Sequence, residues 1–161
     1  MHNSLFLIHN SKKGFTLIEL LIVVAIIGIL AALLMANFIG VRQRARDAQR
    51  KSDIRQVQSA LELYRSDTGS YPASLSSCGI NISLKSPDGS STYMQSLPCD
   101  PSGTTGVFNS GVYVYSLSGN VYTLGACLEN SSDNQGTATV PTGCVGSCTC
   151  TSSNYFVVQS P

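Results

Sequence analysis

The residues with the clearest chemical potential lie close to the start of the chain. Glu19 is an isolated carboxylate near the beginning of a long apolar segment. A charged side chain within a membrane helix costs about 2.5 to 3.5 kcal/mol on insertion scales, so Glu19 predicts a functional site with a compensating partner. Just before it, Lys12 and Lys13 lead into Gly14, a small residue that a peptidase can bind closely. The change in sequence character after Gly14 predicts a processing boundary there.

Few other residues are arranged for catalysis or for holding a metal ion. Both histidines, His2 and His9, precede Gly14, so a chain cleaved there contains none, which disfavours Ser-His-Asp, Cys-His and histidine-metal sites. The sequence has neither a P-loop nor a G-x-G-x-x-G phosphate turn. A cluster of oxygen-bearing side chains comprises Glu129, Asn130, Asp133 and Asn134. Its spacing differs from that of an EF-hand, so we expect a hydrophilic loop, no metal site and no enzyme, with calcium as the alternative.

All six cysteines lie in the C-terminal half: Cys78, Cys99, Cys127, Cys144, Cys148 and Cys150. An even number beyond an apolar segment indicates disulfides in an oxidising compartment. Zinc is the alternative, but the last three cysteines lack the paired C-x2-C spacing of common zinc modules. A bridge between Cys78 and Cys99 would close about twenty residues and stabilise the fold by roughly 3 kcal/mol, and we predict it. We expect Cys148 and Cys150 to pair with other cysteines, because a bridge between them would close a very tight loop.

Residues 15–40 are chiefly Leu, Ile, Val and Ala. With a helical rise of about 1.5 Å per residue they can cross a hydrocarbon core of roughly 30 Å, which predicts a transmembrane helix. Residues 1–14 then form a leader. The alternative is a signal peptide that includes the apolar run, but this run exceeds the usual length of about 7 to 15 residues and lacks a clear A-x-A site. Gly28 permits close contact with other copies, or is simply tolerated.

Apolar residues recur three and four positions apart after residue 40, which predicts an amphipathic stem helix over residues 41–68. The stripe includes Ile54, Val57, Leu61 and Tyr64. Gly69 is a candidate for the left-handed residue that ends the helix, and Pro72 lies just beyond. We therefore expect one continuous helix from about Phe15 to about Ser66, whose apolar stripe must be covered by residues nearer the C-terminus.

The stem is rich in charge, with seven basic and four acidic residues: Arg42, Arg44, Arg46, Arg50, Lys51, Arg55 and Arg65, and Asp47, Asp53, Glu62 and Asp67. The mixed signs favour pairing within the helix or between subunits. A DNA contact, a membrane-surface patch and a solvated face are the alternatives. Positive-inside counting alone would place the C-terminal part in the cytoplasm. The cysteines and the Ser/Gly/Thr-rich composition beyond residue 67 favour the opposite orientation, which we adopt.

Residues 69–161 are predicted to form a head of loops, a β-hairpin and disulfides. Residues 70–111 are rich in turn-forming residues and indicate a loop-dominated connection. Two β-rich runs, 112–117 and 121–124, flank a Ser-Gly-Asn turn, and 155–158 predicts a third strand. A small sheet needs an apolar partner, which the stem stripe supplies. The expected fold class is α+β, a long N-terminal helix packed on a small antiparallel sheet, with residues 130–153 as a disulfide-tied loop.

A family resemblance rests on three elements of the sequence. Lys12-Lys13-Gly14-Phe15-Thr16-Leu17-Ile18-Glu19, followed by the apolar run, resembles the N-terminal signature of type IV prepilins and type II secretion pseudopilins. Residues 60–72, Ala-Leu-Glu-Leu-Tyr-Arg-Ser-Asp-Thr-Gly-Ser-Tyr-Pro, resemble the major pseudopilin pattern. Asp100-Pro101-Ser102-Gly103 resembles the Asp-Pro-Trp-Gly turn of that family, with Ser102 in place of Trp. The calcium loop of major pseudopilins is not recognisable in this sequence.

The resemblance implies that a membrane prepilin peptidase cuts after Gly14 and methylates the new amino group of Phe15. It implies that Glu19 neutralises a Phe15 amine, its own or a neighbour's, in the core of a filament. Expected partners are further copies of the chain, other pilins, the prepilin peptidase, and an assembly platform with its ATPase machinery. The expected location is a single pass of the inner (cytoplasmic) membrane with the head outside the cytoplasm, followed by an extracellular or periplasmic filament.

We therefore predict a structural subunit of a type IV pilus or a type II secretion pseudopilus, with Glu19 and Gly28 acting in assembly. The alternative function is a minor or competence pilin whose head or basic stem binds DNA. A third possibility is a signal-anchored secreted protein that forms no polymer.

Overall fold

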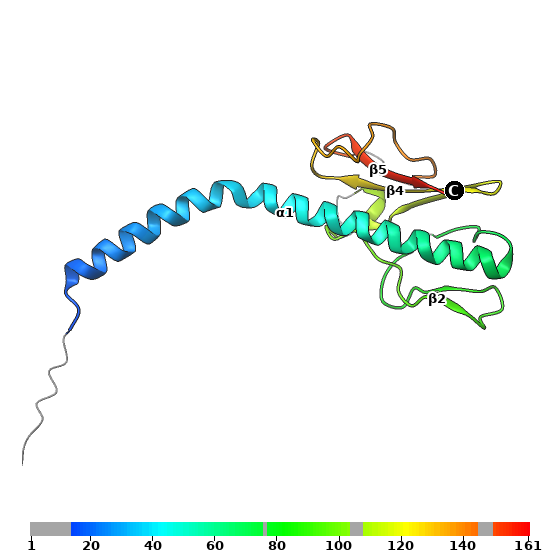
Figure 1. Ribbon diagram of the computed structural model, residues 1–161, viewed down its shortest axis with the longest axis horizontal. Helices are drawn as coiled ribbons and strands as arrows, with labels where there is room; N and C mark the ends of the chain where they lie inside the picture. The colour runs from blue at the N-terminus through cyan, green and yellow to red at the C-terminus, as the bar shows by residue number, and fades with distance from the viewer. Residues whose placement is uncertain (1–13, 76, 104–107, 145–149) are drawn as a thin grey trace, which may run out of the picture. The chain divides into compact units, whose positions relative to one another are not determined.

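The computed structural model describes residues 14–161, apart from residue 76, segments 104–107 and 145–149, and the side chains of residues 36, 37, 108 and 109. Of the leader expected at residues 1–14, all but Gly14 lies outside the described residues. One long helix comes first and is followed by short strands and loops (Figure 1), which confirms the predicted α+β class. The chain divides into two compact units, one ending at Ile39 and the other spanning Gly40–Pro161.

Helix α1 spans Leu17–Thr68 and contains 52 residues. Its end is close to the predicted one, and Gly69 has the expected left-handed backbone, with φ 79°. The Gly69 N–H donates to the carbonyl of Arg65 at 2.8 Å, which satisfies one of the last carbonyls of the helix. The Thr68 hydroxyl donates to the Tyr64 carbonyl, also at 2.8 Å.

The first part of α1 is apolar and exposed. Leu17–Met35 has a mean hydropathy of 3.1, and none of it is buried against the rest of the chain. Among the described residues it is the one helical segment that is long and apolar enough to cross a membrane. Large exposed apolar surfaces are typical of segments that contact a membrane or another protein.

The main sheet is antiparallel and has three strands in the order β3 (Val114–Ser118), β4 (Val121–Leu128) and β5 (Asn154–Gln159). Ser118 pairs with Val121 across the hairpin turn, and Leu124 pairs with Val158. The predicted hairpin and third strand are confirmed. Strand β4 extends farther than the sequence predicted, because Gly125 and Ala126 are poor strand formers.

Gly125 has a structural role within β4. A side-chain Cβ at this position would lie 2.6 Å from Cγ of Pro141, so only glycine fits beneath the loop that crosses the sheet. The same loop forms an isolated bridge from Thr137 to Tyr155 in β5. The predicted surface loop therefore packs closely on the sheet.

The connection expected to be loop-dominated contains a second, two-stranded sheet. Its strands are β1 (Leu84–Lys85) and β2 (Thr92–Met94), and a 3-10 turn, η1, spans Phe108–Gly111. Strands of two and three residues are too short for alternation of apolar and polar residues to predict them. This small sheet also contacts the stem, since the rings of Tyr93 and Tyr64 have centroids 5.3 Å apart.

The stem stripe is buried, as predicted. Its four members are 0 to 8% exposed: Ile54, Val57, Leu61 and Tyr64. They belong to one core cluster with Tyr122, Leu124 and Leu128 of β4 and with Leu84 of β1. Figure 1 shows this part of α1 running along the strands of the head. The stem and the two sheets thus cover one another's apolar faces.

Two disulfides whose cysteines both lie in the described part of the chain cross-link the irregular parts of the head. The predicted bridge between Cys78 and Cys99 is present, with the Cα atoms 5.2 Å apart. A second bridge joins Cys127 of β4 to Cys150, so Cys150 pairs away from Cys148, as expected. Cys144 is disulfide-bonded, and Cys148 lies outside the described residues. Because its sulfur is in a disulfide, Cys150 is not a zinc ligand, and the zinc alternative does not hold for this residue.

The core predicts a sharp contrast between two leucines of the stem. Leu61 is fully buried, whereas Leu63, two residues on, is 58% exposed. Leu61→Ala should lower the free energy of unfolding by about 2 to 5 kcal/mol, because it removes buried methyl groups and leaves a cavity. Leu63→Ala is the matched control and should change it by less than about 0.5 kcal/mol. Urea unfolding of both variants measures the difference, and equal losses would contradict this packing.

Candidate functional site: the helix start and the polar clamp

The first turn of α1 is closed by Thr16 and Glu19. The backbone N–H and the hydroxyl of Thr16 each donate to Oε2 of Glu19 at 2.8 Å. The backbone N–H of Glu19 donates in turn to the Thr16 hydroxyl at 3.3 Å. This reciprocal pattern is a capping box, which satisfies amide groups that have no partner within the helix. The Glu19 carboxylate therefore already has partners within its own chain.

The sequence prediction assigned Glu19 only to a Phe15 amine and missed this cap. The signal was present, since Thr-x-x-Glu before an apolar run is the spacing of a capping box. Phe15 itself is 90% exposed, next to the predicted cleavage point after Gly14. The cap holds the carboxylate beside the residues that cleavage would turn into a new chain end.

Gly28 lies on the exposed part of α1. A Cβ built at Gly28 would meet no heavy atom within 4 Å. Packing within its own chain therefore gives no reason for a glycine at this position. Any steric requirement for it must come from a partner.

A second cluster of polar residues joins the stem to the head. We call it the polar clamp, and its members are Arg46, Asp47, Arg50, Lys51, Asp100, Ser102, Glu129 and Asp133. At its centre, Asp47 and Arg50 are only 1% and 2% exposed. Arg50 Nη1 donates to Oδ1 of Asp47 at 2.7 Å, one turn away on the same helix. The backbone N–H groups of Glu129 and Asn130 also donate to Asp47, each at 2.8 Å.

Arg50 also reaches the turn at residues 100–103, through the edge of its guanidinium that carries Nε and Nη2. Its Nε and Nη2 donate to the two carboxylate oxygens of Asp100 at 2.7 and 2.8 Å, a bidentate arrangement. Nη2 also donates to the hydroxyl of Ser102 at 2.6 Å. Ser102 occupies the position of Trp in the Asp-Pro-Trp-Gly turn that this segment resembles. The indole of a tryptophan has no hydrogen-bond acceptor for a guanidinium. The departure from the pattern thus supplies one more partner for the buried arginine.

The rim of the clamp fixes the loop after β4. Arg46 Nε donates to Oε1 of Glu129 at 2.6 Å, and Arg46 makes a second bond through Nη2. This hydrogen bonding lowers the pKa of Glu129 to about 2. Lys51 Nζ donates to Asp133 at 2.6 Å, which lowers the pKa of that carboxyl. Both acidic side chains of the loop are therefore ionised and paired at neutral pH.

These contacts bear on two alternatives that the sequence left open. The loop around Glu129 and Asp133 does not fit a calcium site, because each of its carboxylates is bonded to a cation of the stem. No group of three or more His, Cys, Asp or Glu side chains suited to a metal occurs within the described residues. The predicted pairing within the helix is confirmed for Asp47 and Arg50. The sequence did not predict that the remaining partners come from the head of the same chain.

Tyrosine hydroxyls donate further hydrogen bonds to carboxylates of the stem. The Tyr113 hydroxyl donates to buried Asp53 at 2.7 Å, and burial raises the pKa of Asp53. Nearer the end of α1, Glu62 accepts from the hydroxyls of Tyr122 at 2.9 Å and Tyr71 at 3.0 Å. The clamp, the bond to Asp53 and the bonds to Glu62 thus connect the stem to the head at three positions along α1.

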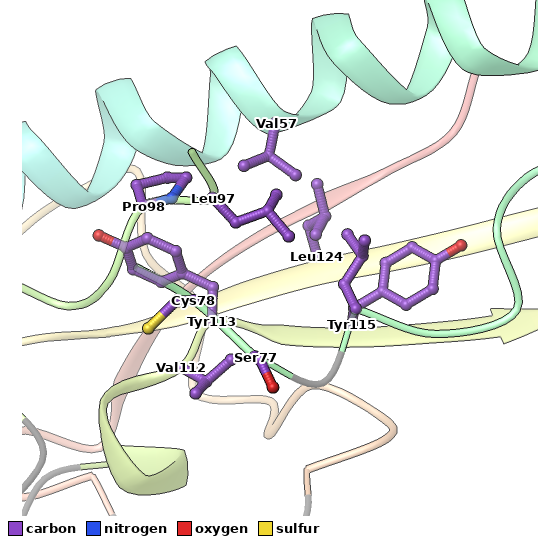
Figure 2. Close-up of a pocket in the computed structure, with 10 residues that line it drawn as sticks. Val57, Ser77, Cys78, Leu97, Pro98, Val112, Tyr113, Tyr115 and Leu124 are labelled. Carbon is purple, nitrogen blue, oxygen red and sulfur yellow. The ribbon is translucent and has the colours of Figure 1, made fainter. Parts of the chain in front are cut away.

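A small pocket lies beneath the stem in the head. Figure 2 shows Val57 of α1 facing Leu97 and Leu124 across it. The tyrosine hydroxyls near it are used by the fold, since Tyr113 donates to Asp53 and Tyr115 donates to the carbonyl of Pro72. A ligand site needs a few convergent polar groups in an apolar pocket. We therefore assign this pocket to packing.

Two known protein families match this chain, one over the helix start and the other over the polar clamp. The prokaryotic N-terminal methylation motif matches residues 9–35, and type II secretion system protein G matches residues 37–138. The chain belongs to the type II secretion protein G family. The first match includes Gly14, Phe15 and Glu19, and the second includes the stem and every residue of the clamp.

Individual relatives come from two kinds of system. The chain is 34% identical over 139 residues to the type II secretion system core protein G of Pseudomonas aeruginosa, covering 78% of this chain and 92% of that protein. It is 42% identical over 84 residues to the type IV wide pilus major component PilA4 of Thermus thermophilus, covering 52% and 63%. No solved structure matches the chain.

The clamp predicts that one arginine of the stem has a large effect on stability and another has none. Arg50→Ala leaves Asp47 and Asp100 buried without their cation, so the free energy of unfolding should fall by about 3 to 5 kcal/mol. Arg55→Ala removes an exposed arginine from the same helix and should change it by less than about 0.5 kcal/mol. Thermal and urea unfolding of the two variants provide the measurement. An Arg50 variant as stable as the Arg55 control would contradict the role of the clamp.

Proposed function

We propose that this protein is a structural subunit of a type IV pilus or a type II secretion pseudopilus that polymerises through its N-terminal helix. The observation that carries this proposal is the contrast between the two parts of α1. The stem buries its apolar stripe in its own head, whereas Leu17–Met35 presents an apolar surface that the described residues leave exposed. Such a segment is stable only in lipid or against similar helices.

The functional division of the chain follows the resemblance and the family. Residues 1–14 are a leader that a prepilin peptidase removes after Gly14, and Phe15 is then methylated on its new amino group. Residues 15–40 first span the membrane and later form the filament core. Residues 41–68 are the stem, and residues 69–161 are the head outside the cytoplasm. The match of the methylation motif to residues 9–35 supports the cleavage and methylation sites.

Glu19 has the central role in assembly. Its Oε2 is held by Thr16, which places the carboxylate within one helical turn of the Phe15 amine. A desolvated carboxylate and ammonium attract strongly, while either one alone in an apolar core is penalised. Pairing of Glu19 with a Phe15 amine, its own or a neighbour's, therefore favours the bundled state.

Gly28 contributes to the same core through close helix contacts. Since nothing in its own chain requires a glycine there, contact with neighbouring copies is the role that we assign to it. The partners are further copies, other pilins, the prepilin peptidase, and an assembly platform with its ATPase. We assign no catalytic activity and no cofactor, including calcium.

The alternative of a DNA-binding minor or competence pilin is not favoured. That alternative assigned DNA binding to the head or to the basic stem, and in the stem Arg46, Arg50 and Lys51 are bonded to acidic residues of the head. The relatives are named as core or major components of their systems. A subunit that is abundant in the filament agrees better with both observations.

The assembly role predicts a defect that is separate from folding. Glu19→Val should leave a membrane-inserted chain with a normal head but lower the filament yield by more than about tenfold, because an unpaired buried ammonium costs about 3 to 5 kcal/mol. Ile18→Val is the matched control in the same turn and should assemble normally. Sheared filaments and membrane fractions are quantified for each variant. Normal filament yield with Glu19→Val would rule out the proposed role.

A further inference from the structure

Asp88 differs from the other acidic residues of the head, because no described residue supplies a cation to it. The others are Asp100, Glu129 and Asp133, and each of them is paired with a cation of the stem. Asp88 is exposed and lies in the turn between β1 and β2. We call residues 86–91 the hairpin tip. The head thus presents one negative charge at this tip that its own chain leaves unpaired.

The hairpin tip holds the Asp88 carboxylate in one orientation. The hydroxyls of Ser86 and Ser90 donate to its Oδ1 at 2.5 and 2.9 Å, and the backbone N–H of Ser90 donates to the same atom at 3.2 Å. The bond from Ser86 is the main cause that lowers the pKa of Asp88 to about 2, so the side chain is ionised at neutral pH. Because all three bonds end on Oδ1, the other oxygen, Oδ2, is open to a donor from a second molecule.

The stem has an exposed face with a single positive charge. At about 100° per residue, the exposed residues Ser52, Ser59 and Leu63 lie within about 80° of Arg55 around the helix. Arg55 is the charged member of this group, and its side chain forms no ion pair with any described residue. We call these four residues the outer stem face. Its charge is opposite to that of the hairpin tip.

An ion pair between Arg55 and Asp88 would join two copies of the chain. Both residues belong to one compact unit, Gly40–Pro161, and they are not bonded to each other within it. Lys85 is an exposed cation beside the tip, but pairing of Lys85 with Asp88 between two hairpins would be isologous and would end at a dimer. A contact from the hairpin tip of one copy to the stem of the next uses two different surfaces, so it can repeat along a filament.

We propose that the hairpin tip of each subunit docks on the outer stem face of a neighbouring copy, where Asp88 bonds to Arg55. The inference rests on the proposed function and adds a head-to-stem contact to those of the N-terminal helices. Exposed ion pairs alone stabilise little, but this carboxylate is oriented in advance and the serines beside Arg55 are small enough for a close approach. The pair fixes the register between neighbours, because a shifted neighbour leaves both charges unpaired.

Charge exchange in the full chain tests the pair. D88K and R55E each place like charges opposite one another, so each should lower the yield of sheared filaments about threefold or more. D88K/R55E restores opposite charges in exchanged positions and should recover most of the wild-type yield. K85E is the matched control, since it reverses an exposed charge on the same hairpin, and it should assemble normally. Thermal unfolding of each variant checks that its head is folded.

Zero-length cross-linking of filaments locates the contact directly. R55K keeps the charge and supplies an amine that a carbodiimide couples to a nearby carboxylate. Filaments assembled from a mixture of isotopically light and heavy R55K chains should yield a peptide pair that joins Asp88 of one chain to position 55 of another. Wild-type filaments have a guanidinium there, which does not couple, and should not yield this pair.

Several outcomes would overturn the proposal. Normal filament yield with D88K or R55E, or no recovery in D88K/R55E, would refute the pair. Recovery of D88K by R44E, or a cross-link from Asp88 to Lys85, would place Asp88 against a different surface and refute it as well. These results leave the proposed function intact, because the wild-type chain still forms filaments. A wild-type chain that forms none would contradict the proposed function and the docking together.

Discussion

The burial of the Arg50 guanidinium among carboxylates is the interaction on which the organisation of the head depends. Arg50 and Asp47 lie on the buried face of the stem, where an unpaired charge would be strongly destabilising. Their partners come from two segments, the turn at residues 100–103 and the loop that follows β4. Both segments are rich in small polar residues and have little apolar surface to bury. Charge pairing and disulfides therefore fix them where hydrophobic packing alone could not.

The same arrangement explains how one helix can serve two environments. The stem buries its apolar stripe and pairs its buried charges within its own chain. The segment Leu17–Met35 is not buried by the described residues, and its apolar surface suits lipid or other helices. Its first turn, however, is capped internally by Thr16 and Glu19. The head and the apolar segment are thus stabilised by separate sets of contacts.

The sequence predicted those elements that follow a regular pattern. A continuous apolar run predicted the first part of the helix, apolar residues spaced three and four apart predicted the stem stripe, and Gly69 marked the helix end. The β-rich runs predicted β3, β4 and β5. The clamp was missed because Asp47 and Arg50 occupy stripe positions, in the series 47, 50, 54, 57, 61 and 64, with charged residues. A pattern based on hydrophobicity assigns such residues to solvent. Their partners Asp100 and Glu129 are distant in sequence, so only the folded chain brings them together.

The central claim is that the chain is a pilin-type subunit whose mature form begins at Phe15. Mass spectrometry of the N-terminal peptide, from protein extracted from membranes, tests this claim most directly. We expect a peptide that begins at Phe15 and carries one methyl group on its amine. A peptide that begins at Met1 would contradict processing, and one that begins at Asn37 would identify a cleaved signal sequence and exclude the apolar helix from the mature protein.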